Sequence, residues 1–255
     1  MPTSRSRRPP LLFVHGGYTD GWCWVPHFLD WFAARGWPAH ALSLRGHGGS
    51  AGAELLFASG LDDYAADVER VAGTLAEPPV LIGHSMGAAI VERMIAIHPH
   101  RGAVLLAPVP PTGLAGIAAR LAFERPDALA RMASLDPARL TDDVLAALRP
   151  FYFSDDAEPS ILAAMSSHIG AESPRAILDL SLRLHWVKPE RNGTPLAVIG
   201  AGSDRICAPA DVRATARHHG VEATIVPGLA HMLMLEPAWE RAAEVIAPWL
   251  GTLRA

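Results

Sequence analysis

The most specific chemical signal in the chain is the run GHSMG at residues 83–87. A short apolar run precedes it, and a segment with the apolar spacing of a helix follows it. A serine at a tight strand-to-helix turn is typical of a nucleophile elbow, in which a strained backbone exposes the hydroxyl. Such a turn needs small residues two positions away on either side, and Gly83 and Gly87 supply them. Ser85 is therefore the expected nucleophile.

A serine nucleophile needs a base, an acid and donors for an oxyanion, and the chain offers each of them after an apolar run. Asp204 follows one such run, and His231 follows the last one. The order Ser85, Asp204, His231 differs from the orders of the two other common triads. The run HGG at 15–17 follows the first apolar run, so we expect the backbone N–H groups of Gly17 and Met86 to form the oxyanion hole.

Other titratable residues close to these positions have structural interpretations. His84 adjoins the serine, but its side chain in an elbow points away from the nucleophile, which favours a packing role. His15 is expected to brace the oxyanion turn, and His47 to organise its own loop. Asp211 opens a predicted helix as a cap, while Glu236 precedes a proline and is expected to support the site indirectly or to start a helix.

The elements that must position these residues alternate between apolar runs and helical segments. Runs that are apolar throughout indicate a parallel sheet covered on both faces, and strand–helix alternation indicates an open α/β fold. The expected strands are 11–14, 39–44, 80–82, 103–106, 196–199 and 223–226. The expected helices between or after them are 23–35, 61–76, 86–98, 209–219 and 238–250.

One interval interrupts this alternation, because residues between the fourth and fifth expected strands contain only helical segments. Prolines separate these segments, each placed to start or stop a helix. We therefore predict a core of residues 1–108 and 190–255, with a helical cap, 109–189, inserted over the site. The predicted cap helices are 114–123, 127–134, 141–149, 158–168 and 174–185, and the prolines are Pro126, Pro137, Pro150, Pro159 and Pro174.

The composition excludes several classes of protein. The chain has 255 residues, 50% of them hydrophobic, and a net charge of −4, which argues against a nucleic-acid-binding surface. Two cysteines, Cys23 and Cys207, and no ligand spacing argue against a disulfide framework or a metal site, and no cofactor is expected. The first apolar run is too short for a signal peptide or membrane span. We expect a cytoplasmic monomer or homodimer that binds a small-molecule substrate and neither nucleic acid nor membrane.

Taken together, five tracts resemble landmarks of the α/β-hydrolase superfamily in the same order along the chain. The resemblance covers the whole chain except the detailed sequence of the cap. It implies an α/β-hydrolase fold with a mostly parallel sheet of about six strands, and it supports the triad. The tracts are HGGYTDGWCW, ALSLRGHGGS, LIGHSMGAAI, VIGAGSDRICAP and PGLAHMLMLEP.

Two details are similar to the branch of plant methylesterases, hydroxynitrile lyases and small bacterial esterases. The short segment before Leu11 leaves no room for the two leading strands of the full sheet, and the run GWCW at 21–24 follows the oxyanion loop. The lyases of that branch carry Thr and Lys where this chain has Gly16 and Met232, so the resemblance favours an esterase. One position departs from the superfamily, because Ser43 replaces the usual Asp before the RGHG turn.

These features predict a serine hydrolase that cleaves a carboxylic ester of a small to medium, largely apolar substrate through an acyl-enzyme on Ser85. The same triad could instead cleave a thioester or a carbon–carbon bond, or serve a lyase or cyclase step of a biosynthetic pathway. A non-catalytic small-molecule receptor is a third alternative. The side chains expected to bind substrate are Tyr18, Trp22, Phe123, Met132, Phe153, Trp186 and Met232.

Overall fold

The sheet at the centre of the molecule is parallel and has six strands in the order β2-β1-β3-β4-β5-β6. A computed structural model describes residues 8–133, 142–182 and 191–253. All six predicted strands are confirmed, with the second one two residues shorter and the third and fifth two residues longer than predicted. They are β1 (Leu11–Val14), β2 (Ala39–Leu42), β3 (Val80–His84), β4 (Ala103–Leu106), β5 (Leu196–Ala201) and β6 (Ala223–Val226).

The burial of the strands follows their position in the sheet. Every residue of β1, β3 and β4 is buried, while the edge strands β2 and β6 each have only one buried residue. Side chains of a strand alternate between the two faces, so a strand buried throughout must be covered on both of them. This explains why the central runs are apolar at every position.

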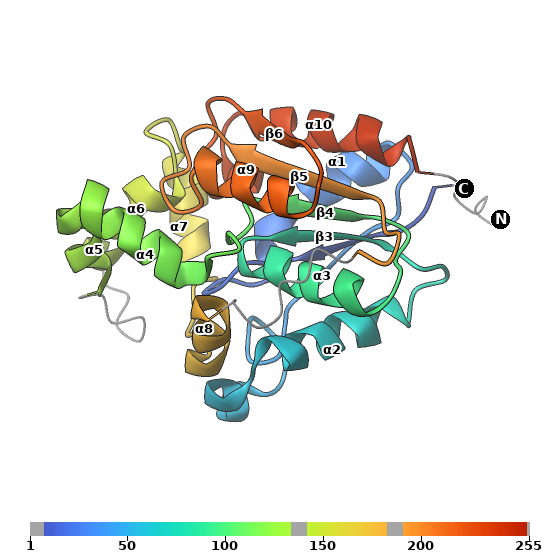
Figure 1. Cartoon of the computed structure of the whole chain (residues 1–255), viewed down its shortest axis with the longest axis horizontal. Helices are drawn as coiled ribbons and strands as arrows, with labels where there is room; N and C mark the ends of the chain where they lie inside the picture. The colour runs from blue at the N-terminus through green and yellow to red at the C-terminus, as the bar shows by residue number, and fades with distance from the viewer. Residues whose placement is uncertain (1–7, 134–141, 183–190, 254–255) are drawn as a thin grey trace.

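Helices provide this cover, with α2 and α3 on one face of the sheet and α1 and α10 on the other (Figure 1). Every predicted core helix is present, although the first is split into a short 3-10 turn and α1. The 3-10 helices are η1 (Gly21–Trp24), η2 (Ala53–Ala58) and η4 (Leu233–Leu235). The core α-helices are α1 (Phe28–Ala34), α2 (Leu61–Ala72), α3 (Met86–Ile97), α9 (Pro209–His218) and α10 (Glu240–Leu250).

Among the described residues, five α-helices lie between β4 and β5, and α4–α7 gather beyond one end of the sheet, away from the chain termini (Figure 1). We call α4–α8 and the loops between them the insert. Three of its prolines start helices as predicted, but the prediction for Pro150 was wrong because it lies inside α6. Pro137 lies outside the described residues. The helices are α4 (Gly113–Glu124), α5 (Pro126–Ala133), α6 (Asp142–Tyr152), α7 (Pro159–Ser166) and α8 (Pro174–Ser181).

The helical insert lies where the sequence places the cap, between the two parts of the core. Its exact limits, 109–189, stay a prediction, because residues 183–190 lie outside the described residues. In the described part of the chain, no helix is both long and apolar enough to cross a membrane.

Candidate active site

The backbone of Ser85 has a conformation that ordinary residues avoid. Ser85 directly follows β3 and begins the turn into α3, with φ 53° and ψ −114°. A non-glycine residue with such angles costs about 1–3 kcal/mol and persists only where the surroundings impose it. The side chain is half-buried, whereas its neighbours in β3 and the first turn of α3 are buried. The structure therefore presents Ser85 in the way the sequence pattern predicts.

The two glycines of the motif are required by close backbone contacts. A Cβ atom on Gly83 would lie 2.3 Å from the carbonyl oxygen of Gly87. A Cβ atom on Gly87 would lie 2.4 Å from the carbonyl oxygen of Val14. Both distances fall well inside van der Waals contact, and backbone atoms of a buried sheet cannot move away cheaply. Glycine at these positions lets α3 start directly against β1 and β3.

The substitution Gly87→Ala is expected to destabilise the protein by about 3 kcal/mol or more, the upper end for overpacking a core. The added methyl group would have to displace the backbone of β1. Urea denaturation followed by circular dichroism measures the change. Gly49→Ala is the matched control, because no atom lies within 4 Å of its added Cβ. Equal unfolding midpoints for the two variants would contradict this account of the elbow.

Asp204 and His231 form a buried hydrogen-bonded pair, with 2.8 Å between Asp204 Oδ2 and His231 Nδ1. The second oxygen, Asp204 Oδ1, accepts from the backbone N–H groups of Ile206 (2.8 Å) and Cys207 (2.9 Å). These two N–H groups orient the carboxylate, so that Oδ2 faces the imidazole of His231. His231 then carries its proton on Nδ1 and leaves Nε2 as the basic atom.

The two loops that carry this pair are joined to each other through the backbone. Gly202 N–H donates to the carbonyl of Val226 over 2.8 Å, and Ser203 N–H donates to the carbonyl of Leu229 over 2.9 Å. The turn after β5 and the turn after β6 therefore keep a fixed separation. This explains how residues 27 positions apart in sequence reach hydrogen-bond distance.

His84 also supports the position of His231. Its Nε2 lies 2.9 Å from the backbone carbonyl of His231, so Nε2 must be the donor. Burial, together with the nearby His231, holds the pKa of His84 well below its usual value, so the ring is neutral. His84 is therefore a buried residue that contacts the backbone of His231 and does not act as a base. This agrees with the predicted packing role, to which the structure adds the hydrogen bond.

The loop that carries Gly17 approaches the turn of Ser85 and Met86. A Cβ on Gly16 would be 3.2 Å from Ser85 Cβ, and one on Gly17 would be 3.9 Å from Met86 Sδ. Within the described residues, the N–H of Gly17 donates no hydrogen bond. Met86 is the first residue of α3 and has no helical acceptor for its N–H. Both residues therefore have an uncommitted N–H, and that of Met86 lies directly after Ser85 at the positive end of α3.

His15 fixes the start of this loop, as predicted. Its Nδ1 lies 2.8 Å from the carbonyl of Gly16, and its Nε2 accepts from the N–H of Leu44 over 3.0 Å. Burial and the nearby charge of His47 lower the pKa of His15 to about 4. The imidazole is thus neutral, with its proton on Nδ1, and connects the loop to the end of β2.

The structure brings Asp204 and His231 together but does not join Ser85 to them by a hydrogen bond. Ser85 Oγ has no hydrogen-bond partner among the residues that the structure describes. Catalytic hydrogen bonds are often long before substrate binds and shorten in the reacting complex. The role of Ser85 therefore stays a prediction supported by its backbone geometry and its neighbours.

Glu172 is a residue of the site that the sequence pattern did not reveal. It lies in the insert between α7 and α8, and its side chain is 0% exposed. One oxygen accepts from Tyr64 Oη and from the N–H of Ser173, each over 2.7 Å. The other accepts from the N–H of Tyr18 (3.3 Å) and faces His47 Nε2 (3.2 Å). His47 was predicted to organise its own loop, and it also reaches across to the insert.

The aromatic residues predicted beside the oxyanion turn are partly accessible. Tyr18 is half-buried and has a positive φ of 63°. Trp22 is also half-buried, and its ring stacks on His168 of the insert with 4.4 Å between centroids. Tyr152, a half-buried residue of α6, lies edge-on to His231 with 5.7 Å between centroids. Of the three rings, that of Tyr152 contacts His231 directly. The roles of Tyr18 and Trp22 in binding substrate stay predictions.

The other predicted substrate-binding residues have mixed outcomes. Phe123 is 91% exposed at the end of α4, so the prediction that it lines an enclosed pocket was wrong. Phe153 and Met232 are buried in the core, and whether they contact substrate stays a prediction. Met132 lies in α5, where only its backbone is described, and Trp186 lies outside the described residues.

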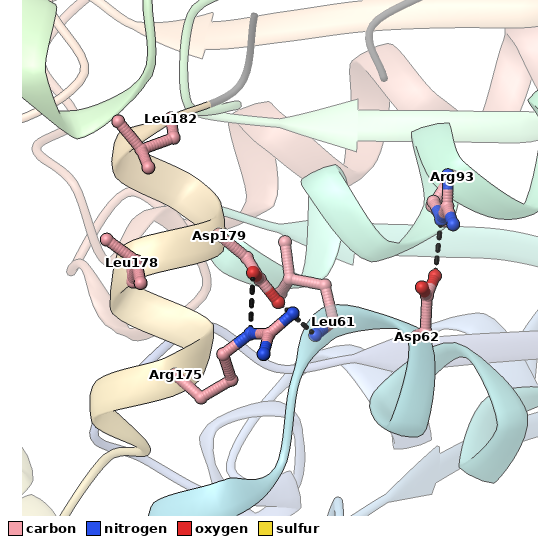
Figure 2. Close-up of a pocket in the computed structure, with 7 residues that line it drawn as sticks. All are labelled: Leu61, Asp62, Arg93, Arg175, Leu178, Asp179 and Leu182. Atoms are coloured by element: carbon pink, nitrogen blue, oxygen red, sulfur yellow. Dashed lines mark hydrogen bonds and ion pairs between the residues drawn. The ribbon is translucent and has the colours of Figure 1, made fainter. Parts of the chain in front are cut away.

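A cavity of about 420 Å³ lies away from this site, between α8 and the start of α2 (Figure 2). Two ion pairs lie in its walls, Arg175–Asp179 within α8 and Asp62–Arg93 between α2 and α3. No residue of the predicted triad lines it. Among the described residues, no group of three or more His, Cys, Asp or Glu side chains could hold a metal ion. The cavity is lined by Leu61, Asp62, Arg93, Arg175, Leu178, Asp179 and Leu182.

Comparisons with known proteins agree with this architecture. The model of the alpha/beta hydrolase family matches residues 11–247. Among solved structures, the chain is similar to Rv0554 from Mycobacterium tuberculosis, with 22% identity and a TM-score of 0.74 over 98% of this chain and 92% of that one. A search of curated proteins found no match.

Two further structures resemble the chain in fold and come from proteins named as esterases. Polyneuridine aldehyde esterase has 15% identity and a TM-score of 0.74, covering 94% of this chain and 99% of its own. The methylesterase MES16 from Arabidopsis has 19% identity and a TM-score of 0.69, covering 94% and 98%. Identities this low establish the fold and leave the substrate open.

Proposed function

Because the chain belongs to the alpha/beta hydrolase family, we propose that it is a serine hydrolase that cleaves carboxylic esters. The observation that carries the proposal is the buried Asp204–His231 hydrogen bond, together with the one that His84, the residue before Ser85, donates to the carbonyl of His231. The named esterases of similar fold support the choice of bond. The proposed substrate is small to medium in size and largely apolar.

In the proposed reaction, Ser85 Oγ attacks the ester carbonyl while His231 Nε2 takes its proton. Asp204 stabilises the imidazolium that forms, because its Oδ2 faces the Nδ1 proton. The negative oxygen of the tetrahedral intermediate binds the N–H groups of Gly17 and Met86, and losing one such donor typically costs about 3 kcal/mol. His231 then protonates the leaving alcohol.

Water completes the cycle by hydrolysing the acyl group from Ser85. His231 removes a proton from the water as its oxygen attacks the acyl carbon, and the second tetrahedral intermediate uses the same two donors. The bond to Ser85 Oγ then breaks, His231 returns the proton to Oγ, and the carboxylic acid leaves. No step of this scheme requires a metal or an organic cofactor. All of the chemistry is assigned to residues that follow β1, β3, β5 and β6 in the chain, at the carboxyl ends of parallel strands.

We further propose that the insert acts as a cap that selects the substrate. Its contact with the site is direct, because Tyr152 of α6 lies beside His231 and accepts a backbone hydrogen bond from Met232 N–H over 2.9 Å. Aromatic rings and buried apolar side chains near the nucleophile are typical of pockets for apolar ligands. The acyl or alcohol part of the substrate would lie between them.

A series of p-nitrophenyl esters with acyl chains lengthened from acetate tests this proposal. Each methylene that the pocket buries contributes about 0.8 kcal/mol, so kcat/KM is expected to rise about fourfold per carbon until the pocket is full. A flat profile would contradict an apolar pocket, and no turnover of any ester would contradict the proposed reaction.

Thioester cleavage by the same residues is the main alternative reaction. Matched acyl thioesters of the same chain lengths distinguish it, because both substrates share the acyl pocket and differ in the leaving group. Preference for the oxyester by kcat/KM is the expected result. A preference of tenfold or more for the thioester would reassign the chain to thioester chemistry.

A further inference from the structure

The insert contacts the predicted oxyanion loop, residues 15–18, through the backbone of Tyr18. The N–H of Tyr18 donates to Glu172 Oε2 over 3.3 Å, and its carbonyl accepts from the N–H of Gly170 over 3.0 Å. Both partners belong to the loop between α7 and α8. The insert thus binds both the backbone N–H and the backbone carbonyl of Tyr18, the residue after Gly17.

The same two segments meet again a few residues further along. His168 of the insert has its Nδ1 2.9 Å from Asp20 Oδ2, and its ring stacks on Trp22. Asp20 also accepts from the N–H of Trp22 over 2.7 Å, so it caps the 3-10 turn that follows the oxyanion loop. The insert therefore contacts the segment 18–22 at Tyr18, Asp20 and Trp22.

The protonation state of this contact can be derived from its hydrogen bonds. His47 Nδ1 lies 2.9 Å from the carbonyl of Arg45, and His47 Nε2 lies 3.2 Å from the Glu172 carboxylate. Both partners are acceptors when Glu172 is ionised, and a neutral imidazole has only one N–H to donate. Both hydrogen bonds therefore form together only when His47 is a cation paired with the Glu172 anion.

The electrostatics agree with this assignment. Burial opposes a charge on His47, but the hydrogen bond and negative charge of Glu172 outweigh it and raise the pKa of His47. Burial likewise opposes ionisation of Glu172, but hydrogen bonds from His47 and Tyr64, with the charge of His47, hold the pKa of Glu172 below its usual value. Both shifts favour the ionised pair.

The position of this pair matters for the proposed chemistry. Glu172 Oε2 lies 3.4 Å from the point where a Cβ of Gly17 would be. An unpaired carboxylate this close to an oxyanion hole would repel the negative charge that develops there. The cation of His47 removes that repulsion, while the carboxylate keeps its hydrogen bond to Tyr18.

We propose that Glu172, ion-paired with His47, is a positioning residue that fixes the oxyanion loop from the insert. This inference rests on the proposed function, since it assumes that the N–H of Gly17 binds the oxyanion. Glu172 itself does not touch the substrate. Its effect is to couple the position of the insert to the backbone geometry of Gly17. Stabilisation of the transition state therefore depends on how the insert packs on the oxyanion loop.

The substitution Glu172→Gln tests this role. The glutamine oxygen can stay where Oε1 accepts from Tyr64 and Ser173, with the NH₂ group donating to Nε2 of a neutral His47. The N–H of Tyr18 then faces the NH₂ group and loses its acceptor. We expect kcat for a p-nitrophenyl ester to fall about 10- to 100-fold, within the range for a misplaced catalytic group, while KM changes less than threefold. Affinity for an alkyl trifluoromethyl ketone, whose adduct with Ser85 carries an oxyanion, should fall by a similar factor. Affinity for the matching methyl ketone should stay within threefold.

Asp179→Asn is the matched control. Asp179 is a carboxylate of α8 that also joins the insert to the core, because its Oδ2 accepts from the N–H of Leu61 over 3.2 Å (Figure 2). It does not contact the oxyanion loop. The control should keep kcat and both ketone affinities within threefold of the wild type. The proposal is overturned if the two variants lose transition-state affinity equally, or if neither loses it.

A milder variant covers the case in which Glu172→Gln does not fold. Tyr64→Phe removes one hydrogen bond to Glu172 and leaves both charges in place, so a 3- to 10-fold loss of trifluoromethyl ketone affinity is expected. Unchanged affinity would overturn the proposal. Failure of the proposed function itself gives a different result, because the wild type would then neither hydrolyse the esters nor form the ketone adduct.

The ion pair also predicts how stability depends on pH. The folded pKa of His47 lies above its ordinary 6.5, so its contribution is full below pH 6.5 and is lost as pH rises through the folded value. The folded pKa of Glu172 lies below 4.5, so its contribution is full above pH 4.5 and is lost on acidification. The groups facing His47 are Glu172, Asp20, the neutral His15 and Tyr64.

Thermal melts of the wild type and Glu172→Gln should therefore differ most between pH 4.5 and 6.5. The difference in Tm should shrink as the pH rises above this window. A difference in Tm that stays constant from pH 5 to pH 9 would show that no charged pair is present, and it would overturn this part of the proposal.

Discussion

Replacing Ser85 with alanine is expected to lower kcat for ester hydrolysis by roughly 10⁴–10⁶, the range seen when a serine nucleophile is removed. In the proposed reaction the hydroxyl of Ser85, at the strained turn, supplies the attacking oxygen, and alanine leaves no nucleophile in its place. Steady-state hydrolysis of the best p-nitrophenyl ester measures the change. The substitution leaves the hydrogen bond of Ser85 N–H to the carbonyl of Leu106 in place.

Ser203→Ala is a suitable control for Ser85→Ala. Ser203 is exposed and adjoins Asp204, and its structural contact is made by its backbone N–H, which alanine retains. A fluorophosphonate probe should label the wild type and the control and should not label Ser85→Ala. A folded Ser85→Ala protein with more than 1% of wild-type kcat would exclude Ser85 as the nucleophile. No labelling of the wild type would favour a non-catalytic receptor.

The parts of the site that could be predicted from the sequence depend on local backbone requirements. Gly83 and Gly87 are needed because backbone atoms lie within 2.5 Å of any added Cβ, and this constraint is visible as a short motif. The strands were predictable for a similar reason, since a central parallel strand buried on both faces has no polar position. Asp204 follows β5 and His231 follows the edge strand β6, and parallel pairing of these strands brings both residues to the same end of the sheet.

Glu172 could not be predicted, because nothing in its local sequence requires a carboxylate. Its partners Tyr18, His47 and Tyr64 lie 154, 125 and 108 residues away, on three different elements. The sequence around it reads as a loop before a helix that starts at a proline. Its role depends on how the insert packs on the core, and apolar periodicity does not encode that packing.

Phe123 shows the opposite error, in which residue type was given too much weight. An aromatic residue near a predicted site was assigned to the pocket, but it lies at the exposed end of α4. Large apolar residues are common on protein surfaces, so the type of a residue alone does not place it in a pocket. The prediction for Pro150 failed for a related reason. The residue type was taken to end the helix, whereas α6 continues through Pro150 to Tyr152.

Replacing Asp204 with asparagine is expected to lower kcat by about 10⁴, the magnitude known for this change in a serine protease triad. Asp204 Oδ1 accepts from the N–H groups of Ile206 and Cys207, so an asparagine must place its oxygen there. Its NH₂ group would then face His231 Nδ1, which would have to become an acceptor. The proton would move to Nε2, and His231 could no longer take the proton of Ser85.

Asp211→Asn is the matched control for this prediction. Asp211 is the other acid near Asp204 in sequence, and its Oδ2 accepts from the N–H of Ala208 (3.0 Å) and contacts Arg120 (3.1 Å). An asparagine oxygen can keep both contacts, so kcat should stay within a few-fold of the wild type. Because Asp204→Asn preserves the shape and backbone contacts of the loop, its thermal stability should change far less than its kcat. Equal kcat values for the two variants would mean that the acid acting on His231 lies elsewhere.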